Sequence, residues 1–164
     1  MHEDIKEHLP FLTRICLKLE ASFILELGVR LGGSTKAFLK AAEVLNAKVV
    51  SIDIEDCSLI SDSRCWEFLQ MNDLDYTPTE KIDVLFIDTD HTYRQTLKEL
   101  VKFAPWVRDN GVIILHDTEH CPEVKKAINT FLNTCLDKYI FENRENNNGL
   151  GILWQRQASS YLVG

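Results

Sequence analysis

Four short apolar runs in the chain each stop at an acidic residue. Branched aliphatic residues fill these runs and polar residues bound them, which is typical of strands buried on both faces of a parallel sheet. In open α/β sheets, ligands bind beyond the carboxyl ends of the strands. We therefore expect the four acids to gather at one edge of the sheet, where they would serve a ligand with hydroxyls, a cation, a metal ion or a proton to be removed. They are Glu26, Asp53, Asp88 and Asp117.

The size and charge of the chain limit its class. It has 164 residues and a formal net charge of −7. A chain of this length buries enough surface for a core, so we expect a single domain over residues 1–164. The negative charge argues against binding to nucleic acid, which needs clustered lysine and arginine.

The cysteines indicate a compartment. Their number, five, is odd, and no CxxC pair occurs, which predicts free thiols and a cytoplasmic location. The start of the sequence has no basic segment followed by an apolar one, so we expect no secretory signal. No apolar stretch approaches the ~20 residues of a membrane span, so we expect no membrane partner.

Helical and strand patterns alternate along the chain. This order predicts an α/β, Rossmann-like three-layer fold, with helices on both faces of a mostly parallel sheet. The turn-rich segment 146–149 predicts a hairpin that supplies the one antiparallel strand. Asp109-Asn110-Gly111 predicts a turn before the fifth strand. Expected helices cover about 4–20, 35–45, 93–107 and 122–137, and expected strands about 23–26, 49–53, 65–69, 84–88, 112–117, 139–141 and 150–154.

A glycine-rich segment follows the first expected strand. Gly28, Gly32 and Gly33 lie in it, and glycine lets a backbone adopt positive φ and approach a ligand closely. The segment matches neither GxGxxG nor a phosphate-binding loop. Asp53 ends the next strand about 25 residues later, where a carboxylate can accept both hydroxyls of a ribose. A ribose-bearing ligand is favoured over a glycine turn needed only for packing.

Asn72 and Asp73 follow the third expected strand. The pair is a candidate to bond an adenine amino group. An ordinary turn closed by the Asn72 side chain explains the pair equally well.

The densest polar cluster lies at the ends of the fourth and fifth strands. Adjacent parallel strands are about 5 Å apart, so Asp88, His116 and Asp117 are candidates to hold one divalent cation. The alternative is that the two acids cap helices or bond the ligand directly. His91 lies three residues after Asp88 and is a candidate general base, because imidazole titrates near neutral pH. Without a metal ion, Asp88 or Asp90 would orient its ring.

The pattern His116-x₃-His120-Cys121 contains zinc-ligand residue types. No second CxxC or HxxxH pair accompanies it, so it gives little support to a zinc site.

Taken together, these motifs resemble those of class I S-adenosylmethionine-dependent methyltransferases. The resemblance is strongest to small-molecule O-methyltransferases of the catechol and macrocin type and to cephalosporin-hydroxylase-like relatives. It covers about 23–118 and 148–153. The motifs are E-x-G-x-x-x-G-x-S, F-I-D-x-D-H-x-Y and G-V-I-I-x-H-D.

The resemblance implies a seven-stranded sheet of order 3-2-1-4-5-7-6 with the last strand antiparallel. It also implies that the loop from Glu26 to Ser34 cradles the amino-acid part of S-adenosylmethionine and that Asp53 holds the ribose. In metal-using members, acids matching Asp88 and Asp117 bind Mg²⁺, and a histidine matching His91 is the base in macrocin-type members. The residues expected to bind cofactor are Glu26, Gly28, Arg30, Gly32, Gly33, Ser34, Asp53, Asp73 and Asp88.

We therefore expect methylation of a hydroxyl on a small molecule or sugar, with or without Mg²⁺ or another divalent cation. His91 and Asp88 are the expected catalytic residues. Only about 20 residues precede the first strand, so the acceptor pocket is expected to be shallow or completed by another subunit of a homo-oligomer. Two alternatives stay open: an oxidoreductase that binds NAD or another nucleotide, and a cofactor-binding module without catalysis.

Overall fold

A seven-stranded sheet runs through the computed structural model, which describes residues 5–135 and 138–156. The strand order is β3-β2-β1-β4-β5-β7-β6, as predicted. Most residues of β1, β2, β4 and β5 are buried, whereas the edge strand β3 is half-buried. The strands are β1 Phe23–Leu27, β2 Lys48–Asp53, β3 Trp66–Gln70, β4 Ile82–Ile87, β5 Val107–His116, β6 Tyr139–Arg144 and β7 Leu150–Gln155.

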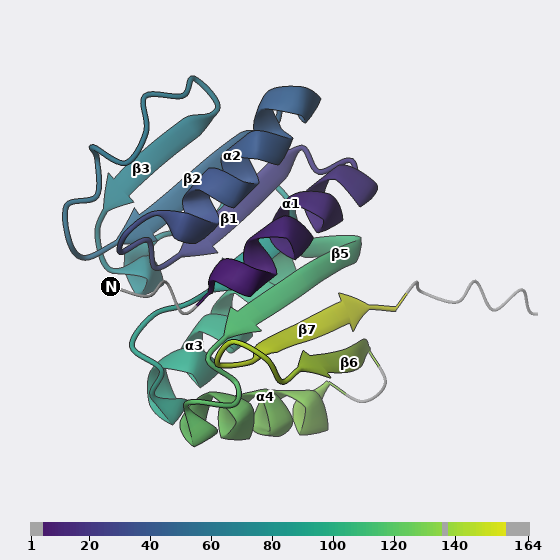
Figure 1. The fold of residues 1–164 in the computed structure, drawn as a ribbon. Coiled ribbons are helices and arrows are strands. Elements are labelled where there is room, and N and C mark those ends of the chain that lie inside the picture. The colour runs from purple at the N-terminus through teal and green to yellow at the C-terminus, as the bar shows by residue number, and fades with distance from the viewer. Residues whose placement is uncertain (1–4, 136–137, 157–164) are drawn as a thin grey trace, which may run out of the picture.

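The sheet is mostly parallel. Strands β1 to β5 pair in parallel, and β7 runs antiparallel to both β5 and β6. The turn between β6 and β7 contains Asn147, Asn148 and Gly149, which all have positive φ. The predicted hairpin and its antiparallel last strand are confirmed (Figure 1).

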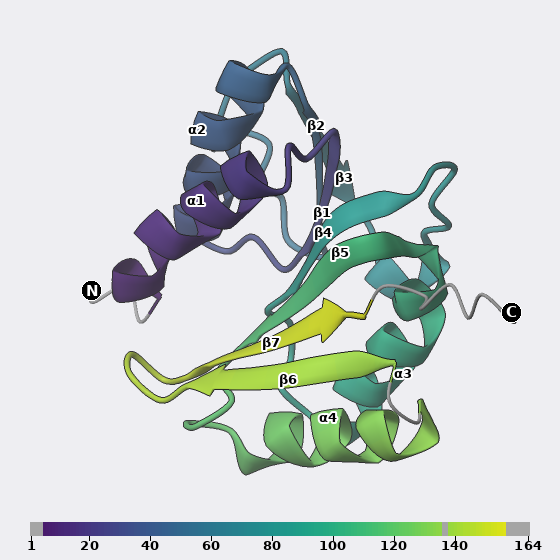
Figure 2. The same cartoon turned by 90° about the vertical axis from the view of Figure 1, so that its right-hand side faces the viewer.

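Helices cover both faces of the sheet. Figure 2 shows α1 and α2 on one face and α3 and α4 on the other. Alternate strand residues point to these two layers, so that Phe38 of α2 packs edge-on against Phe86 of β4, while Leu100 and Phe103 of α3 pack in the opposite layer. The helices are α1 Leu9–Lys18, α2 Gly33–Leu45, α3 Tyr93–Phe103 and α4 Pro122–Thr134, with 3-10 turns η1 Lys6–His8, η2 Asp73–Asp75 and η3 Ala104–Trp106.

Helices α1, α3 and α4 are shorter than the sequence patterns predicted, whereas α2 begins two residues earlier, at Gly33. Pro10 lies in the first turn of α1, a position that favours proline at a helix start. The segment before α1 is the separate turn η1. Pro105 ends α3 because it lies in η3, where a continuing α-helix would lose a hydrogen bond. Helix α4 stops at Thr134 and Cys135 is its C-cap; residues 136–137 of its predicted range lie outside the described residues, as does residue 4.

The turn predicted at Asp109-Asn110-Gly111 is wrong. These residues lie inside β5, and the pairing of β5 with β4 shifts register between Ile82 and Val84. Asn110 has φ 65°. A residue with positive φ forms a β-bulge where the strand continues in the same direction. Asparagine and glycine favour such bulges as well as chain-reversing turns.

The five cysteines are all free thiols, as expected. Within the part of the chain that the structure describes, no helix has both the length and the apolar character required to traverse a bilayer.

Candidate active site

A pocket of about 540 Å³ opens at the carboxyl ends of the strands, which is where α/β sheets bind ligands. Its volume is in the range of small-molecule and cofactor sites. The sequence-predicted residues that line it are Gly28, Arg30, Asp53, Asp73, Asp88, His91 and Asp117. Four other predicted cofactor residues lie outside the lining: Glu26, Gly32, Gly33 and Ser34.

Gly28 lies where the loop after β1 crosses the end of β4. Its φ is +88°, and a Cβ atom at this position would collide with the carbonyl oxygen of Asp88. The predicted positive φ is therefore confirmed. The crossing makes glycine necessary for packing as well, because two backbones meet there.

Asp53 ties the glycine-rich loop to the end of β2. Its Oδ2 atom accepts hydrogen bonds from the backbone N–H groups of Val29 (2.8 Å) and Arg30 (3.1 Å), and Oδ1 accepts one from Glu55 (2.9 Å). A carboxylate has about four lone-pair positions. Asp53 therefore keeps acceptor capacity toward the pocket that it lines.

Glu26 does not lie at the sheet edge with the other three acids, and this part of the prediction is wrong. The residue is fully buried inside β1, where its carboxylate accepts hydrogen bonds from the hydroxyls of Ser34, Thr35 and Ser51 at 2.5–2.8 Å. Burial raises the pKa of Glu26 to about 7, although the three hydroxyls oppose the shift. Glu26 thus fastens the start of α2 to β1 and β2.

A second buried carboxyl faces Asp73. The side-chain amide of Gln95 donates to Asp73 Oδ1 (3.0 Å) and to Glu99 Oε1 (2.9 Å), and Thr89 donates to the same Glu99 oxygen (2.7 Å). Burial, followed by the charge of Asp73, raises the pKa of Glu99. Sequence reasoning missed Gln95 and Glu99. Their spacing of four residues places both on one helical face, which was the available signal.

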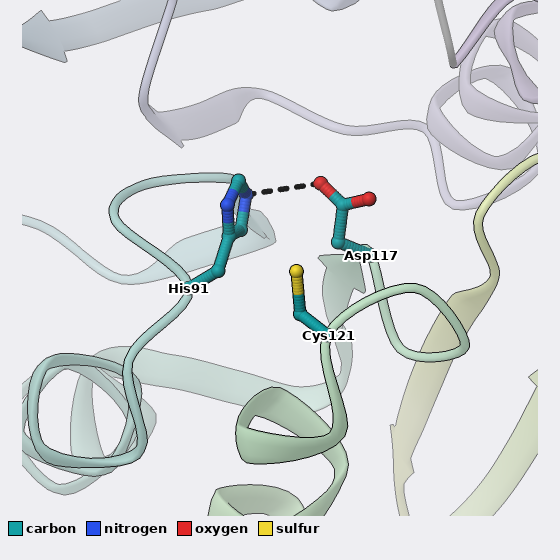
Figure 3. Close-up of side chains that lie close together, drawn as sticks. All are labelled: His91, Asp117 and Cys121. Carbon is teal, nitrogen blue, oxygen red and sulfur yellow. Dashed lines mark ion pairs between the residues drawn. The ribbon is translucent and has the colours of Figure 1, made fainter.

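His91 joins the ends of β4 and β5. Its Nε2 atom lies 2.9 Å from Asp88 Oδ1 and 3.0 Å from Asp117 Oδ2; Figure 3 shows the second contact, with the Cys121 thiol beside it. The φ angles of His91 and Asp117 are 59° and 60°, values that most residues avoid. The side chains of His91 and Asp117 therefore meet from two backbone positions that both have positive φ.

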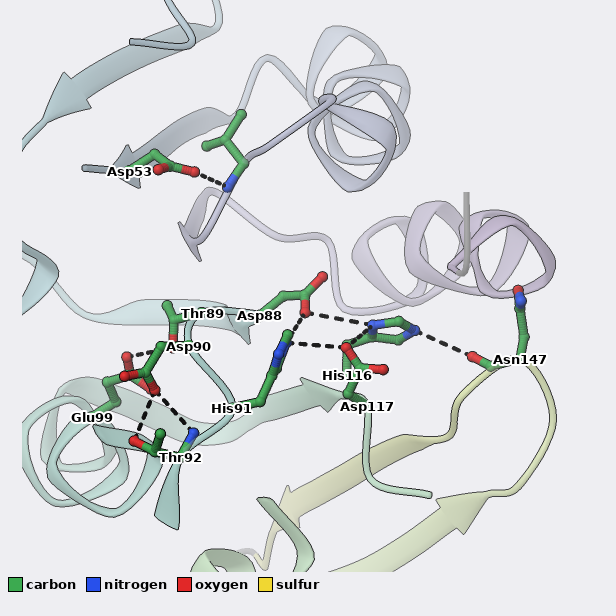
Figure 4. A network of polar contacts seen from close by, with 11 residues as sticks. Asp53, Asp88, Thr89, Asp90, His91, Thr92, Glu99, His116, Asp117 and Asn147 are labelled. Atoms are coloured by element: carbon green, nitrogen blue, oxygen red, sulfur yellow. Dashed lines mark hydrogen bonds and ion pairs between the residues drawn. The ribbon is translucent and has the colours of Figure 1, made fainter. Parts of the chain in front are cut away.

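His116 lies beneath this pair. Its Nδ1 atom is 3.5 Å from Asp88 Oδ1 and 3.3 Å from Asp117 Oδ2, and its Nε2 atom is 3.2 Å from the carbonyl oxygen of Asn147 (Figure 4). Because a carbonyl only accepts, Nε2 must donate. In the neutral ring the lone pair is then on Nδ1 and faces the two carboxylates, as in histidines that ligate metal ions.

The charges in this cluster stabilise one another. Burial opposes charging of His116, but its contacts with Asp117 and Asp88 outweigh burial and raise its pKa to about 10. The hydrogen bond with Asp88 raises the pKa of His91. Burial would raise the pKa of each carboxyl, yet the imidazoles hold the pKa of Asp88 and of Asp117 below its ordinary value. Without a metal ion, the two carboxylates and the two imidazoles thus favour one another's charged forms.

The donor set also fits a divalent cation. Among the described residues, Asp88, His116 and Asp117 offer ligand atoms within 4.8 Å of one another, as do His91, Asp117 and Cys121. Two buried atoms, His116 Nδ1 and Asp117 Oδ1, have no hydrogen-bond partner in the described structure. The predicted convergence is confirmed as geometry. His120 is exposed and belongs to neither set, so the pattern His116-x₃-His120-Cys121 does not form a site.

The order of the strands and the position of the pocket define the class I methyltransferase fold. The methyltransferase-domain family model matches residues 25–118, more than half of the chain. The chain belongs to this methyltransferase family, which favours the expected enzyme over a dinucleotide oxidoreductase. A search of curated proteins gives no match.

Solved structures share the fold. A protein described as a caffeoyl-CoA O-methyltransferase from Staphylococcus aureus is 14% identical with a TM-score of 0.75, over 91% of this chain and 83% of that one. The N-methyltransferase NodS from Bradyrhizobium japonicum is 15% identical with a TM-score of 0.69, over 96% and 89%. MycE, a methyltransferase of mycinamycin biosynthesis in complex with Mg, S-adenosylhomocysteine and mycinamycin VI, is 15% identical with a TM-score of 0.69, over 94% and 51%.

Proposed function

We propose that this protein transfers the methyl group of S-adenosylmethionine to a hydroxyl of a small molecule or sugar. One observation carries the proposal: the Nε2 atom of His91 is fixed between Asp88 and Asp117 at the wall of a cofactor-sized pocket. Asp53, Asp73 and the loop at Gly28 form the cofactor side of that pocket. His91 and Asp117 form the side where the acceptor would enter.

The chemistry requires a proton acceptor close to the incoming hydroxyl. The acceptor oxygen bonds to the methyl carbon, the carbon–sulfur bond breaks with its electron pair going to sulfur, and the hydroxyl proton goes to Nδ1 of His91, because Nε2 already donates to the carboxylates of Asp88 and Asp117. Asp88 and Asp117 orient the ring and stabilise the imidazolium that forms. Such a positioned base contributes about 10²–10⁴ in rate, and alignment of oxygen, carbon and sulfur supplies much of the rest.

A divalent cation is the second part of the proposal. Asp88, His116 and Asp117 would hold it, and the donor set and the unpartnered buried atoms support this assignment. When bound, the ion would lower the pKa of the acceptor hydroxyl. One imidazole among the oxygen ligands favours Mn²⁺ or a similar transition metal over Mg²⁺.

The acceptor side of the pocket is proposed to be completed by a second copy of the chain. Helix α1 precedes the sheet but packs on α2, away from His91. The prediction is a dimer in light scattering, with acceptor affinity that falls when the dimer is diluted.

The test is a transfer assay with methyl-labelled S-adenosylmethionine and matched acceptors that differ only in a hydroxyl or an amine. We expect label on the hydroxyl compounds, with O-methyl products in NMR spectra. Exclusive labelling of the amines would replace this proposal with N-methylation, which a fold shared with an N-methyltransferase also permits.

A further inference from the structure

The thiol of Cys121 lies next to the His91–Asp117 ion pair, outside the lining of the pocket. Cys121 is the residue before α4, and its backbone N–H donates to the carbonyl oxygen of Asp117 (2.8 Å). This turn folds the chain back so that the thiol faces the carboxylate four residues earlier. Figure 3 shows the sulfur of Cys121 on the same side as the His91 ring and the Asp117 carboxylate.

We propose that His91, Asp117 and Cys121 form an inhibitory site for a thiophilic transition-metal dication, represented by Zn²⁺. A ring nitrogen, a carboxylate oxygen and Sγ all lie within 4.8 Å of one another. The ligand atoms of a tetrahedral zinc site are roughly 3.5 Å apart, and the nitrogen–oxygen pair is already at 3.0 Å. A movement of about 1 Å by the half-buried side chains of His91 and Cys121 would complete the geometry.

The carboxylate of Asp117, which both candidate metal sets share, also favours a cation. Asp117 is 4% exposed, and its Oδ1 atom has no hydrogen-bond partner among the described residues. A buried carboxylate oxygen without a partner is costly, and a dication bound to this carboxylate would remove the cost. His91 and Cys121 are only half-buried, so the ion can arrive from solvent.

The thiolate decides the class of metal. Mg²⁺ prefers oxygen ligands and keeps several waters, whereas sulfur with imidazole selects Zn²⁺ or Co²⁺. Binding releases the Cys121 thiol proton to solvent and leaves a sulfur–metal bond. This set differs from the set that contains Asp88 and His116, although the two share Asp117.

The inhibitory effect rests on the proposed function. Zinc bound to one ring nitrogen of His91 would leave the ring's proton on the other nitrogen, so that the base could no longer accept a proton. Asp53, at the cofactor side, takes no part. Zinc is therefore expected to suppress methyl transfer and to leave S-adenosylhomocysteine affinity nearly unchanged.

Titration of the protein with Co²⁺ tests the site without any need for an acceptor substrate. The wild type should develop the near-ultraviolet absorption of a thiolate–cobalt bond, and Zn²⁺ should abolish it. Cys121→Ser should lose the absorption and bind zinc at least about tenfold more weakly, since even a lost outer contact costs about 10–100-fold. Cys135→Ser is the matched control, because Cys135 is a half-buried free thiol at the other end of α4; it should behave as wild type.

Two results would overturn the site: no thiolate–cobalt absorption in the wild type, or an equal absorption in Cys121→Ser. Thermal unfolding of each variant checks that it is folded. With an acceptor in hand, Cys121→Ser should transfer methyl groups normally and resist zinc. If the absorption depends on Cys121 but zinc does not inhibit, the metal site stands and the assignment of His91 as the base is wrong.

Discussion

The Nε2 atom of His91 lies 2.9 Å from Oδ1 of Asp88, three residues earlier in the chain. This bond fixes the ring at the pocket wall. We predict that His91→Gln lowers the methyl-transfer rate by about 10²–10⁴ with little change in cofactor affinity, because Asp53 and not His91 is proposed to hold the ribose of the cofactor. His120→Gln, at an exposed neighbouring histidine, should keep full activity. Equal rates in the two variants, measured with labelled cofactor, would remove His91 from the mechanism.

The metal proposal predicts a reversible effect of chelation. Dialysis against a chelator should lower the transfer rate, and Mn²⁺ or Mg²⁺ should restore it, because Asp88, His116 and Asp117 would again be occupied. Asp117→Asn should reduce the response to added Mn²⁺. If the chelated enzyme keeps its full rate on its own acceptor, no metal acts in transfer and His91 works with Asp88 alone.

The raised pKa of buried Glu26 predicts that the stability of the protein depends on pH. Its pKa rises from the ordinary value of 4.5 to about 7 in the fold, so the folded state binds the proton more tightly than the unfolded chain. Stability from this group is therefore present below pH 4.5 and is lost as the pH rises through 7, by up to about 3 kcal/mol. Glu26→Gln should gain stability relative to wild type between pH 5 and pH 8 in urea denaturation. Parallel pH curves for the two proteins would contradict this assignment.

The close approach of the Gly28 backbone to the Asp88 carbonyl predicts that a side chain at position 28 lowers stability. Gly28→Ala should lower the free energy of unfolding by about 2 kcal/mol or more, because its positive φ and the collision with the Asp88 carbonyl both strain the variant. Gly33→Ala is the control, since Gly33 is the first residue of α2 and alanine favours helix. Equal stability of both variants in chemical denaturation would show that the loop after β1 relaxes freely.

The sequence predicted the parts of the site that follow from sheet geometry. Asp53 is the last residue of β2, Asp88 and Asp117 directly follow β4 and β5, and parallel strands bring their carboxyl ends together. Glu26 comes one residue before the end of its strand. Because strand residues alternate between the faces, that single position turns its carboxylate into the layer of α2.

Other features depend on contacts that no local pattern records. Cys121 reaches the site because a turn returns the chain to Asp117, and the crossing of Gly28 with Asp88 joins residues 60 positions apart. The bulge at Asn110 has the same residue types as a reversing turn. In each case tertiary packing decides between structures that the local sequence permits equally.

The pocket is proposed to bind S-adenosylmethionine through Asp53. The most direct measurement is a calorimetric titration of wild type and Asp53→Ala with S-adenosylhomocysteine and, separately, with NAD. We predict that wild type binds S-adenosylhomocysteine but not NAD, and that Asp53→Ala weakens binding by about 1–3 kcal/mol, because charge-assisted hydrogen bonds to the ribose are lost. Binding of NAD in place of S-adenosylhomocysteine, or equal affinity in the variant, would contradict the account.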